Sequence, residues 1–508
     1  MLKPDMTRAA CDDRPMSKPD RLTALDTSFL HLEQGGAHMH VASVLVFAGE
    51  PPSYDELEAA VGERLHLVPR YRQKLAFVPL GQGRPVWVDD PYFNLRYHVR
   101  HSALPAPGSD EQLKLLAGRL FALELDRQKP LWEIHLVEGL APGPGGEPRF
   151  ALIGKTHHAL VDGVSGVDIT SVLFDASPDP APVGPAGHTW TPSPMPGGTQ
   201  LLADALVERL TVPREAVRGL RSAVRGPRRA LGALAAPAAG MAAMARAGLS
   251  PAPPSPFNVT IGPHRRYTWL DLELGRMKAI KTALGGTLND AVLSAVSLAT
   301  GRWTRAQGHP TDDLVLRAMV PVSVRADVEQ GALGNRVAAV YAPLPVGLDD
   351  AAETFAFVHE AMGDLKASGQ AVGATTLTAL ADFAPTTILS QAARLQTRQR
   401  MFNFVVTNVP GPQFPLYLAG RRLVGLYPVV PLARNTALGI AIMSYDGHLA
   451  FGLLGDFEAM AELDALGDEL AVAVDDLERA AGSRAKAGGA RGGRRMGARV
   501  RPRDAARS

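Results

Sequence analysis

The segment from Lys155 to Gly163 carries the side chains most able to do chemistry. Within it, His157 and His158 are adjacent, Asp162 follows four residues after the second histidine, and Gly163 comes next. An imidazole with its ordinary pKa of about 6.5 can accept and return a proton near neutral pH. A lone histidine in a folded protein is more often a buried residue with a structural hydrogen bond. The pair, its distance from Asp162 and the turn that Gly163 permits instead predict a proton-transfer site.

The flanking residues predict how this segment is held. The apolar run Phe150-Ala151-Leu152-Ile153 before it is typical of a buried strand, and residues 164–174 after it have a pattern compatible with a helix. Upstream, residues 132–137 should form a strand that pairs with the histidine strand through the Gly/Pro-rich loop 141–148. The histidines should therefore lie where a central strand ends and the chain turns.

Composition indicates a two-domain globular protein. The chain has 508 residues, of which 46% are hydrophobic and 20% charged, and its net charge is +2. This length suits two domains of roughly 200 residues each. The single cysteine, Cys11, excludes an intrachain disulfide and a cysteine-based metal site. The first 20 residues are charged throughout, which is unlike a signal peptide, and residues 230–245 are too short and too weakly apolar to span a membrane.

The chain divides into five parts. We expect a flexible leader at 1–20, a domain with the histidines at 21–185, a helical basic linker at 186–255, a second domain at 256–480 and a disordered basic tail at 481–508. Residues 199–248 contain eight Arg against three acidic residues, and residues 482–508 contain nine Lys or Arg against one acid. Such basic segments are compatible with an anionic membrane surface or with nucleic acid, and we expect no nucleic-acid partner.

The second domain should also mix strands and helices. A strand is expected at 267–274, a helix at 288–306, and helices within 350–397. Residues 402–412 should form a strand that ends in a turn, followed by strands at 437–445 and 448–455 and a last helix that ends at about residue 480. Thr287 precedes the 288–306 helix and can cap it, with Asp290 in its first turn.

These motifs together resemble one known family. The 155–163 segment is similar to the HHxxxDG signature of the bacterial wax ester synthase/diacylglycerol acyltransferase family, which belongs to the CoA-dependent acyltransferases with an HxxxDG core. Similar segments follow in the family's order between about residues 22 and 470. They are Met39-His40-Val41, Pro130-Leu131-Trp132, Asn289-Asp290 and Asn408-Val409-Pro410-Gly411. Thr407 stands where many relatives have Ser, which keeps a hydroxyl.

The resemblance implies a fold and a mechanism. The fold would be a mixed α/β, chloramphenicol-acetyltransferase-like one, with two similar halves that face each other across a central channel. His158 would be the general base, His157 a positioning group, and Asp162 a structural residue paired with an arginine. Asn289 and Thr407 are our candidates to stabilise the oxyanion.

The resemblance also implies the substrates. Acyl-CoA would be a substrate rather than a cofactor, and no cofactor or metal is expected. The acceptor would be diacylglycerol or a long-chain alcohol, and the protein would be cytoplasmic and peripherally attached to the inner membrane or to lipid droplets. Two alternatives stay open: acyl transfer from a carrier-protein thioester, and a catalytically silent lipid-droplet surface protein. The chain lacks a Gly-x-Ser-x-Gly elbow and a His-Glu-x-x-His motif, which argues against a serine hydrolase and a zinc protease.

Overall fold

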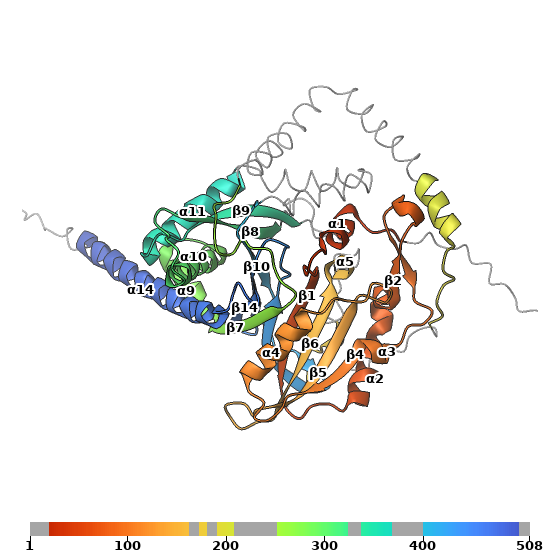
Figure 1. Ribbon diagram of the computed structural model, residues 1–508. Helices are drawn as coiled ribbons and strands as arrows, with labels where there is room; N and C mark the ends of the chain where they lie inside the picture. Colours follow the sequence, from red (N-terminus) through yellow and green to blue (C-terminus); the bar gives the residue numbers. More distant parts are fainter. Residues whose placement is uncertain are drawn as a thin grey trace, which may run out of the picture.

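Two six-stranded mixed sheets form the framework of the protein (Figure 1). The computed structural model describes residues 20–161, 172–179, 190–207, 251–323, 337–367 and 400–496. The first sheet has the order β11-β12-β1-β6-β5-β4, and the second has the order β7-β14-β13-β10-β8-β9. A separate two-stranded sheet consists of β2 and β3. Helices pack against these sheets, so the expected mixed α/β architecture is observed.

The elements of the first half surround the strand that carries the histidines. Their bounds are α1 (Ala24–Leu32), β1 (His40–Ala48), α2 (Tyr54–Arg64), β2 (Gln73–Ala76), β3 (Val86–Asp89), α3 (Leu95–His98), β4 (Val99–Ala103), α4 (Asp110–Phe121), β5 (Trp132–Leu140), β6 (Arg149–His157) and α5 (His158–Val161). Three short 3₁₀ turns, η1 (Leu65–Leu67), η2 (Pro69–Arg72) and η3 (Pro79–Gly81), lie between α2 and β3.

The second half supplies the other sheet and two strands of the first. Its elements are β7 (Arg265–Glu273), α9 (Leu274–Leu284), α10 (Leu288–Ala306), β8 (Val315–Ser323), β9 (Val337–Pro345), α11 (Ala351–Ala367), β10 (Phe404–Pro410), β11 (Tyr417–Leu418), β12 (Arg421–Val429), β13 (Leu438–Tyr445), β14 (His448–Asp456) and α14 (Leu463–Met496).

Local sequence explains why the histidine strand is central. In β6 every residue from Phe150 to His157 is buried, as expected for a strand covered on both faces. It pairs antiparallel with β5 through the predicted hairpin and with β1 on its other side. Helix α10 spans the predicted residues 288–306, and Thr287 caps it through a reciprocal capping box with Asp290, which confirms the predicted cap.

Strand β12 crosses from the second half into the first sheet, which the sequence did not indicate. It pairs antiparallel with β1, so a segment far away in the chain lies one strand away from β6. Its sequence contains Gly425 and Pro428, which ordinarily argue against a central strand. Gly452 on β14 of the second sheet makes room for β12. A Cβ at Gly452 would lie 1.8 Å from the carbonyl oxygen of Pro428.

The two halves share one apolar core. A single cluster of buried side chains includes residues of β1, β5 and β6 from the first half and of β7, α10 and β13 from the second. Besides the β1–β12 pairing, helix α4 joins the halves: Phe121 packs edge-on against Tyr267, with ring centroids 5.2 Å apart. Gly118 of α4 lies so close to β7 that a Cβ there would be 2.8 Å from the Arg265 carbonyl oxygen. The halves are therefore packed directly against each other.

The C-terminal helix extends beyond its predicted end. Residues 481–508 were expected to be disordered, whereas α14 continues to Met496. Ala481 is buried, and the Arg484 side chain donates to the carbonyl oxygen of Leu284 at the end of α9, at 3.0 Å. Residues 485–496 combine Ala, Lys, Arg and Met, which favour helix, with four glycines, which disfavour it. The low apolar content that suggested disorder therefore did not prevent helix formation.

No helix within the described ranges is long and apolar enough to cross a membrane. The expected leader at 1–20 lies almost entirely outside these ranges, as does most of the linker at 186–255.

Candidate active site

The two histidines lie at the end of β6, where the expected turn begins. His157 is the last residue of β6 and His158 the first of α5. On the neighbouring strand β1, His40 is the register partner of His157. The His158 amide donates to the carbonyl oxygen of Met39 at 2.8 Å, just before β1 begins. The main chain of both histidines is therefore fixed by the start of β1.

His157 is buried, with a hydrogen bond at one ring nitrogen and a carboxylate facing the other. Its side chain is 1% exposed. The Ala159 amide donates to Nδ1 at 3.1 Å, so Nδ1 must keep its lone pair and the proton must lie on Nε2. Nε2 faces Oε1 of Glu33 at 3.4 Å, a contact slightly longer than a normal hydrogen bond. This arrangement favours the Nε2–H tautomer of His157 and keeps its ring away from solvent.

Glu33 and Arg127 are residues of the site that the sequence analysis missed. The side chain of Glu33, just after α1, is 7% exposed, and Arg127 donates to its Oε2 at 2.6 Å. Burial alone would raise the pKa of Glu33. Its contacts with His157, the Met39 amide and Arg127 outweigh burial and hold the pKa at about 2. The carboxylate is therefore ionised at any working pH. In the sequence it is a single acid after a helix, which gives no signal of this role.

His158 differs from His157 in its surroundings. It is partly exposed, and its ring lies against that of Phe29 on α1, with centroids 4.1 Å apart and an angle of 30° between the planes. An aromatic neighbour limits the orientations of the ring. Of the two histidines, His158 is therefore the one whose side chain is partly exposed.

Of the four remaining predicted site residues, the structure describes two, Asn289 and Thr407, both in the second half of the chain. Asp162 and Gly163 lie outside the described residues. Asn289 is the second residue of α10, and Thr407 lies on β10 opposite Ala441 of β13. Both side chains are partly exposed, and within the part of the chain that the structure describes neither forms a hydrogen bond, including to His157 or His158. Their polar groups are therefore not committed to the described protein.

A buried ion pair lies on the same strand face as His157. The Lys155 ammonium is 1% exposed and donates to Oε1 of Glu133 at 2.7 Å. It also donates to the carbonyl oxygens of Leu120 and Leu123, at 3.0 and 2.9 Å. All three protons of the ammonium are thus engaged, and Lys155 ties the end of α4 to the histidine strand. Burial lowers the pKa of Lys155, although Glu133 counteracts this effect.

His40 binds the same end of α4 and belongs to the packing of the site. Its Nε2 donates to the carbonyl oxygen of Phe121 at 3.0 Å, and burial holds its pKa well below 6.5. A neutral, buried His40 with this hydrogen bond has a structural role: it holds the end of α4 against β1.

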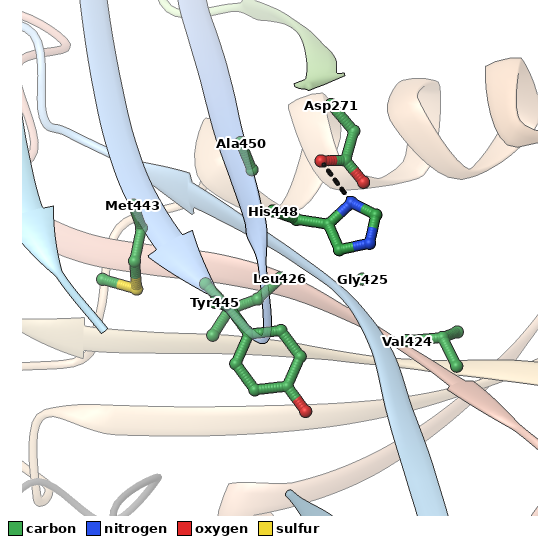
Figure 2. Close-up of a pocket in the computed structure, with 8 residues that line it drawn as sticks. All are labelled: Asp271, Val424, Gly425, Leu426, Met443, Tyr445, His448 and Ala450. Carbon is green, nitrogen blue, oxygen red and sulfur yellow. Dashed lines mark ion pairs between the residues drawn. The ribbon is translucent and has the colours of Figure 1, made fainter. Parts of the chain in front are cut away.

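A small pocket at the junction of β7, β12, β13 and β14 is separate from the histidines (Figure 2). Its lining includes Asp271 and His448, whose Oδ1 and Nδ1 are 3.3 Å apart. Gly425 of this pocket pairs with Val46 of β1, six residues from His40, the register partner of His157. At about 3.3 Å per residue, the pocket lies roughly 20 Å from the histidine pair. It contributes nothing to the histidine site.

Among the residues that the structure describes, no group of three or more His, Cys, Asp or Glu side chains is arranged to hold a metal ion.

Sequence comparison with known proteins identifies similar enzymes. Residues 22–292 match the model of the wax ester synthase/diacylglycerol acyltransferase catalytic domain, and residues 333–478 match that of the WS/DGAT C-terminal domain. The chain is 35% identical over 477 residues to the probable diacylglycerol O-acyltransferase tgs2 of Mycobacterium tuberculosis, a match that covers 91% of this chain and 100% of the relative. It is 32% identical over 465 residues to tgs1 of the same organism, covering 90% and 96%.

Solved structures give the same result at the level of the fold. The wax ester synthase/diacylglycerol acyltransferase from Marinobacter aquaeolei VT8 matches with a TM-score of 0.62 and 28% identity, over 91% of this chain and 100% of that one. The first condensation domain of the CDA synthetase matches with a TM-score of 0.54 and 17% identity, over 91% and 97%, which shows a shared fold. The fold expected from the sequence is therefore confirmed.

Proposed function

Because this chain belongs to the wax ester synthase/diacylglycerol acyltransferase family and is an acyltransferase, we propose that it moves a long-chain acyl group from acyl-CoA to diacylglycerol, forming triacylglycerol. Long-chain alcohols, which would give wax esters, are proposed as further acceptors. Both acceptors are apolar molecules with one reactive hydroxyl, so the same proton transfer serves both.

The observation that carries the mechanism is the engagement of His157. Its Nε2 already holds a proton, and its Nδ1 lone pair accepts the Ala159 amide, so it has no site at which to take a proton from a substrate. His158 is adjacent, partly exposed and reachable. This contrast supports His158 as the general base and His157 as its positioning neighbour.

The proposed reaction is a direct transfer. His158 takes the proton of the acceptor hydroxyl while that oxygen attacks the thioester carbonyl carbon. The tetrahedral oxyanion then collapses, the C–S bond breaks, and the CoA sulfur leaves as a thiolate that receives the proton from the His158 imidazolium. Proton transfer of this kind contributes roughly 10²- to 10⁴-fold to a rate. No acyl-enzyme intermediate is required.

The oxyanion needs a hydrogen-bond donor, and we propose Asn289 and Thr407. The amide of Asn289 and the hydroxyl of Thr407 are partly exposed and uncommitted among the described residues. Asn289 also lies in the first turn of α10, where the helix dipole favours negative charge. Asp162 and Gly163 are proposed, as the family motif implies, to support the turn that follows His158.

Acceptor-dependent CoA release tests the proposed function. Purified protein with palmitoyl-CoA should release free thiol when diacylglycerol or hexadecanol is supplied in mixed micelles, and little without an acceptor. Equal release in water alone would identify a thioesterase. Two further outcomes distinguish the alternatives: transfer only from a carrier-protein thioester would indicate a condensation-type enzyme, and no release under any condition would indicate a silent surface protein.

We also propose that the protein attaches peripherally to membranes or lipid droplets. The basic linker and tail support this through their composition. The β2–β3 hairpin adds an apolar tip, because Leu80 is 85% exposed and Phe77 is 52% exposed. Residues 69–88 around this tip contain four Lys or Arg and no acid. Apolar side chains beside cations suit an anionic lipid surface.

Flotation with vesicles that contain anionic lipid measures this attachment. Binding should weaken between 0.1 M and 1 M salt, because the screening length falls from about 10 Å to about 3 Å. Leu80→Asp should weaken it further, whereas Val472→Asp, a change at an exposed apolar residue on α14, should not. Binding that does not change with salt but is lost in detergent would indicate apolar insertion instead of electrostatic attachment. Absence of binding would contradict both modes of attachment.

A further inference from the structure

Glu33 has an acceptor geometry that only a carboxylate can satisfy. Its Oε1 accepts the Met39 amide at 2.7 Å and faces Nε2–H of His157, while its Oε2 accepts Arg127. The same Arg127 nitrogen donates to the carbonyl oxygen of Leu30 near the end of α1, at 3.1 Å. We call these two side chains the Glu33–Arg127 pair. Two hydrogen-bond donors, the Met39 amide and Arg127, hold this carboxylate, and Nε2 of His157 faces it at 3.4 Å.

The Glu33–Arg127 pair reaches both histidines by separate routes. The first is the direct contact between Glu33 and the ring of His157. The second runs through the main chain: the Met39 amide binds Glu33, and the Met39 carbonyl oxygen accepts the His158 amide. The segment that ends α1, the start of β1 and the end of β6 therefore meet at one buried charge.

We propose that Glu33 is a positioning residue for acyl transfer: held by Arg127, its carboxylate keeps His157 in the Nε2–H tautomer and thereby fixes the turn that presents His158. This inference rests on the proposed function. In this role His157 orients the turn through its Nδ1 contact with the Ala159 amide, which lies directly after His158. Glu33 touches neither substrate, so its effect is on geometry, and a reacting group misplaced by about 1 Å can lose roughly 10²-fold in rate.

The side chain at position 33 can be tested with one atom changed. Glu33→Gln keeps size and one acceptor oxygen, but its NH₂ group must face either Arg127 or the two donors Met39 and His157. One of these contacts then becomes donor against donor. We expect kcat to fall by about 10- to 10²-fold while KM for palmitoyl-CoA changes little.

A double-mutant cycle separates positioning from a general loss of structure. His157→Asn retains an acceptor for the Ala159 amide but removes the Nε2–H that faces Glu33. If Glu33 acts through His157, Glu33→Gln should cost less than about 3-fold in kcat in the His157→Asn background, because coupled residues are not additive. Equal loss in both backgrounds, or an unchanged kcat in the single variant, would overturn the proposal.

Asp90→Asn is the matched control. Asp90 is a buried carboxylate just after β3 that accepts Lys74 at 2.9 Å and the Tyr92 amide, and these partners include neither His157 nor His158. The Asp90→Asn substitution should lower the melting temperature and leave kcat unchanged. Loss of kcat in step with melting temperature in both variants would mean that Glu33 is merely structural.

A measurement that does not depend on turnover tests the role of Glu33 separately from the proposed acyltransfer function. In protein labelled with ¹⁵N-histidine, the two ring-nitrogen resonances of His157, assigned by their loss in His157→Asn, should report the Nε2–H tautomer. Glu33→Gln should shift them and Asp90→Asn should not. Unshifted resonances would overturn the role of Glu33 even in an inactive protein. Absence of acceptor-dependent CoA release in the wild type would instead refute the proposed function.

Discussion

The His158→Ala variant should lose at least about 10²-fold in kcat, since a general base contributes roughly 10²- to 10⁴-fold. The loss should appear in kcat rather than in affinity for acyl-CoA, because His158 acts on the acceptor hydroxyl. The fold should survive, because His158 is only partly buried and its main-chain bond to Met39 does not need the side chain. Acceptor-dependent thiol release and equilibrium binding of palmitoyl-CoA measure the two quantities separately.

His157→Asn is the comparison for that experiment. It retains the acceptor for the Ala159 amide, so its kcat should stay clearly above that of His158→Ala. The reverse ranking, an inactive His157→Asn beside a mildly impaired His158→Ala, would show that the wrong histidine has been assigned as the base. Such a result would leave the membership of the family intact.

The Lys155→Met variant should lose about 3–5 kcal/mol in the free energy of unfolding, the usual cost of breaking a buried ion pair on one side. Met has nearly the same length but no donor. It would leave Glu133, which is 6% exposed, without its closest cation, and two carbonyl oxygens of the α4 end without their donor. Urea denaturation followed by tryptophan fluorescence measures the change.

Lys129→Met serves as the control for Lys155→Met. Lys129 forms one ion pair with Asp126 at 2.8 Å, with both side chains 39% exposed, so solvent screens the interaction. Its removal should leave the denaturation midpoint in place. Equal, small effects of both changes would mean that the buried ammonium contributes little to the fold.

Short-range pattern was enough to predict the framework of the fold. The strand before the histidines, its hairpin partner and the bounds of α10 follow from apolar runs, turn residues and a capping Thr287, all of which are local signals. Helix α4 ends at Phe121, where Lys155 and His40 bind its last carbonyl oxygens. The local sequence pattern cannot indicate a contact made by a residue on a distant strand.

Long-range pairing explains what the sequence did not reveal. The position of β12 depends on its pairing with β1, some 380 residues away in the chain, and its Gly425 and Pro428 conceal it as a strand. Likewise, the histidine pair was identified by its motif, but the carboxylate and the guanidinium beside it come from the residue just after α1 and from the segment after α4. Neither Glu33 nor Arg127 is part of a motif that would have indicated this role.

The fate of a labelled acyl group tests the central claim most directly. Purified protein is incubated with palmitoyl-CoA labelled in the acyl chain and with 1,2-diacylglycerol, and the lipids are separated. We expect label in triacylglycerol for the wild type and for Asp90→Asn, and almost none for His158→Ala. Label that accumulates as free palmitate, or triacylglycerol formed equally well by His158→Ala, would contradict that expectation.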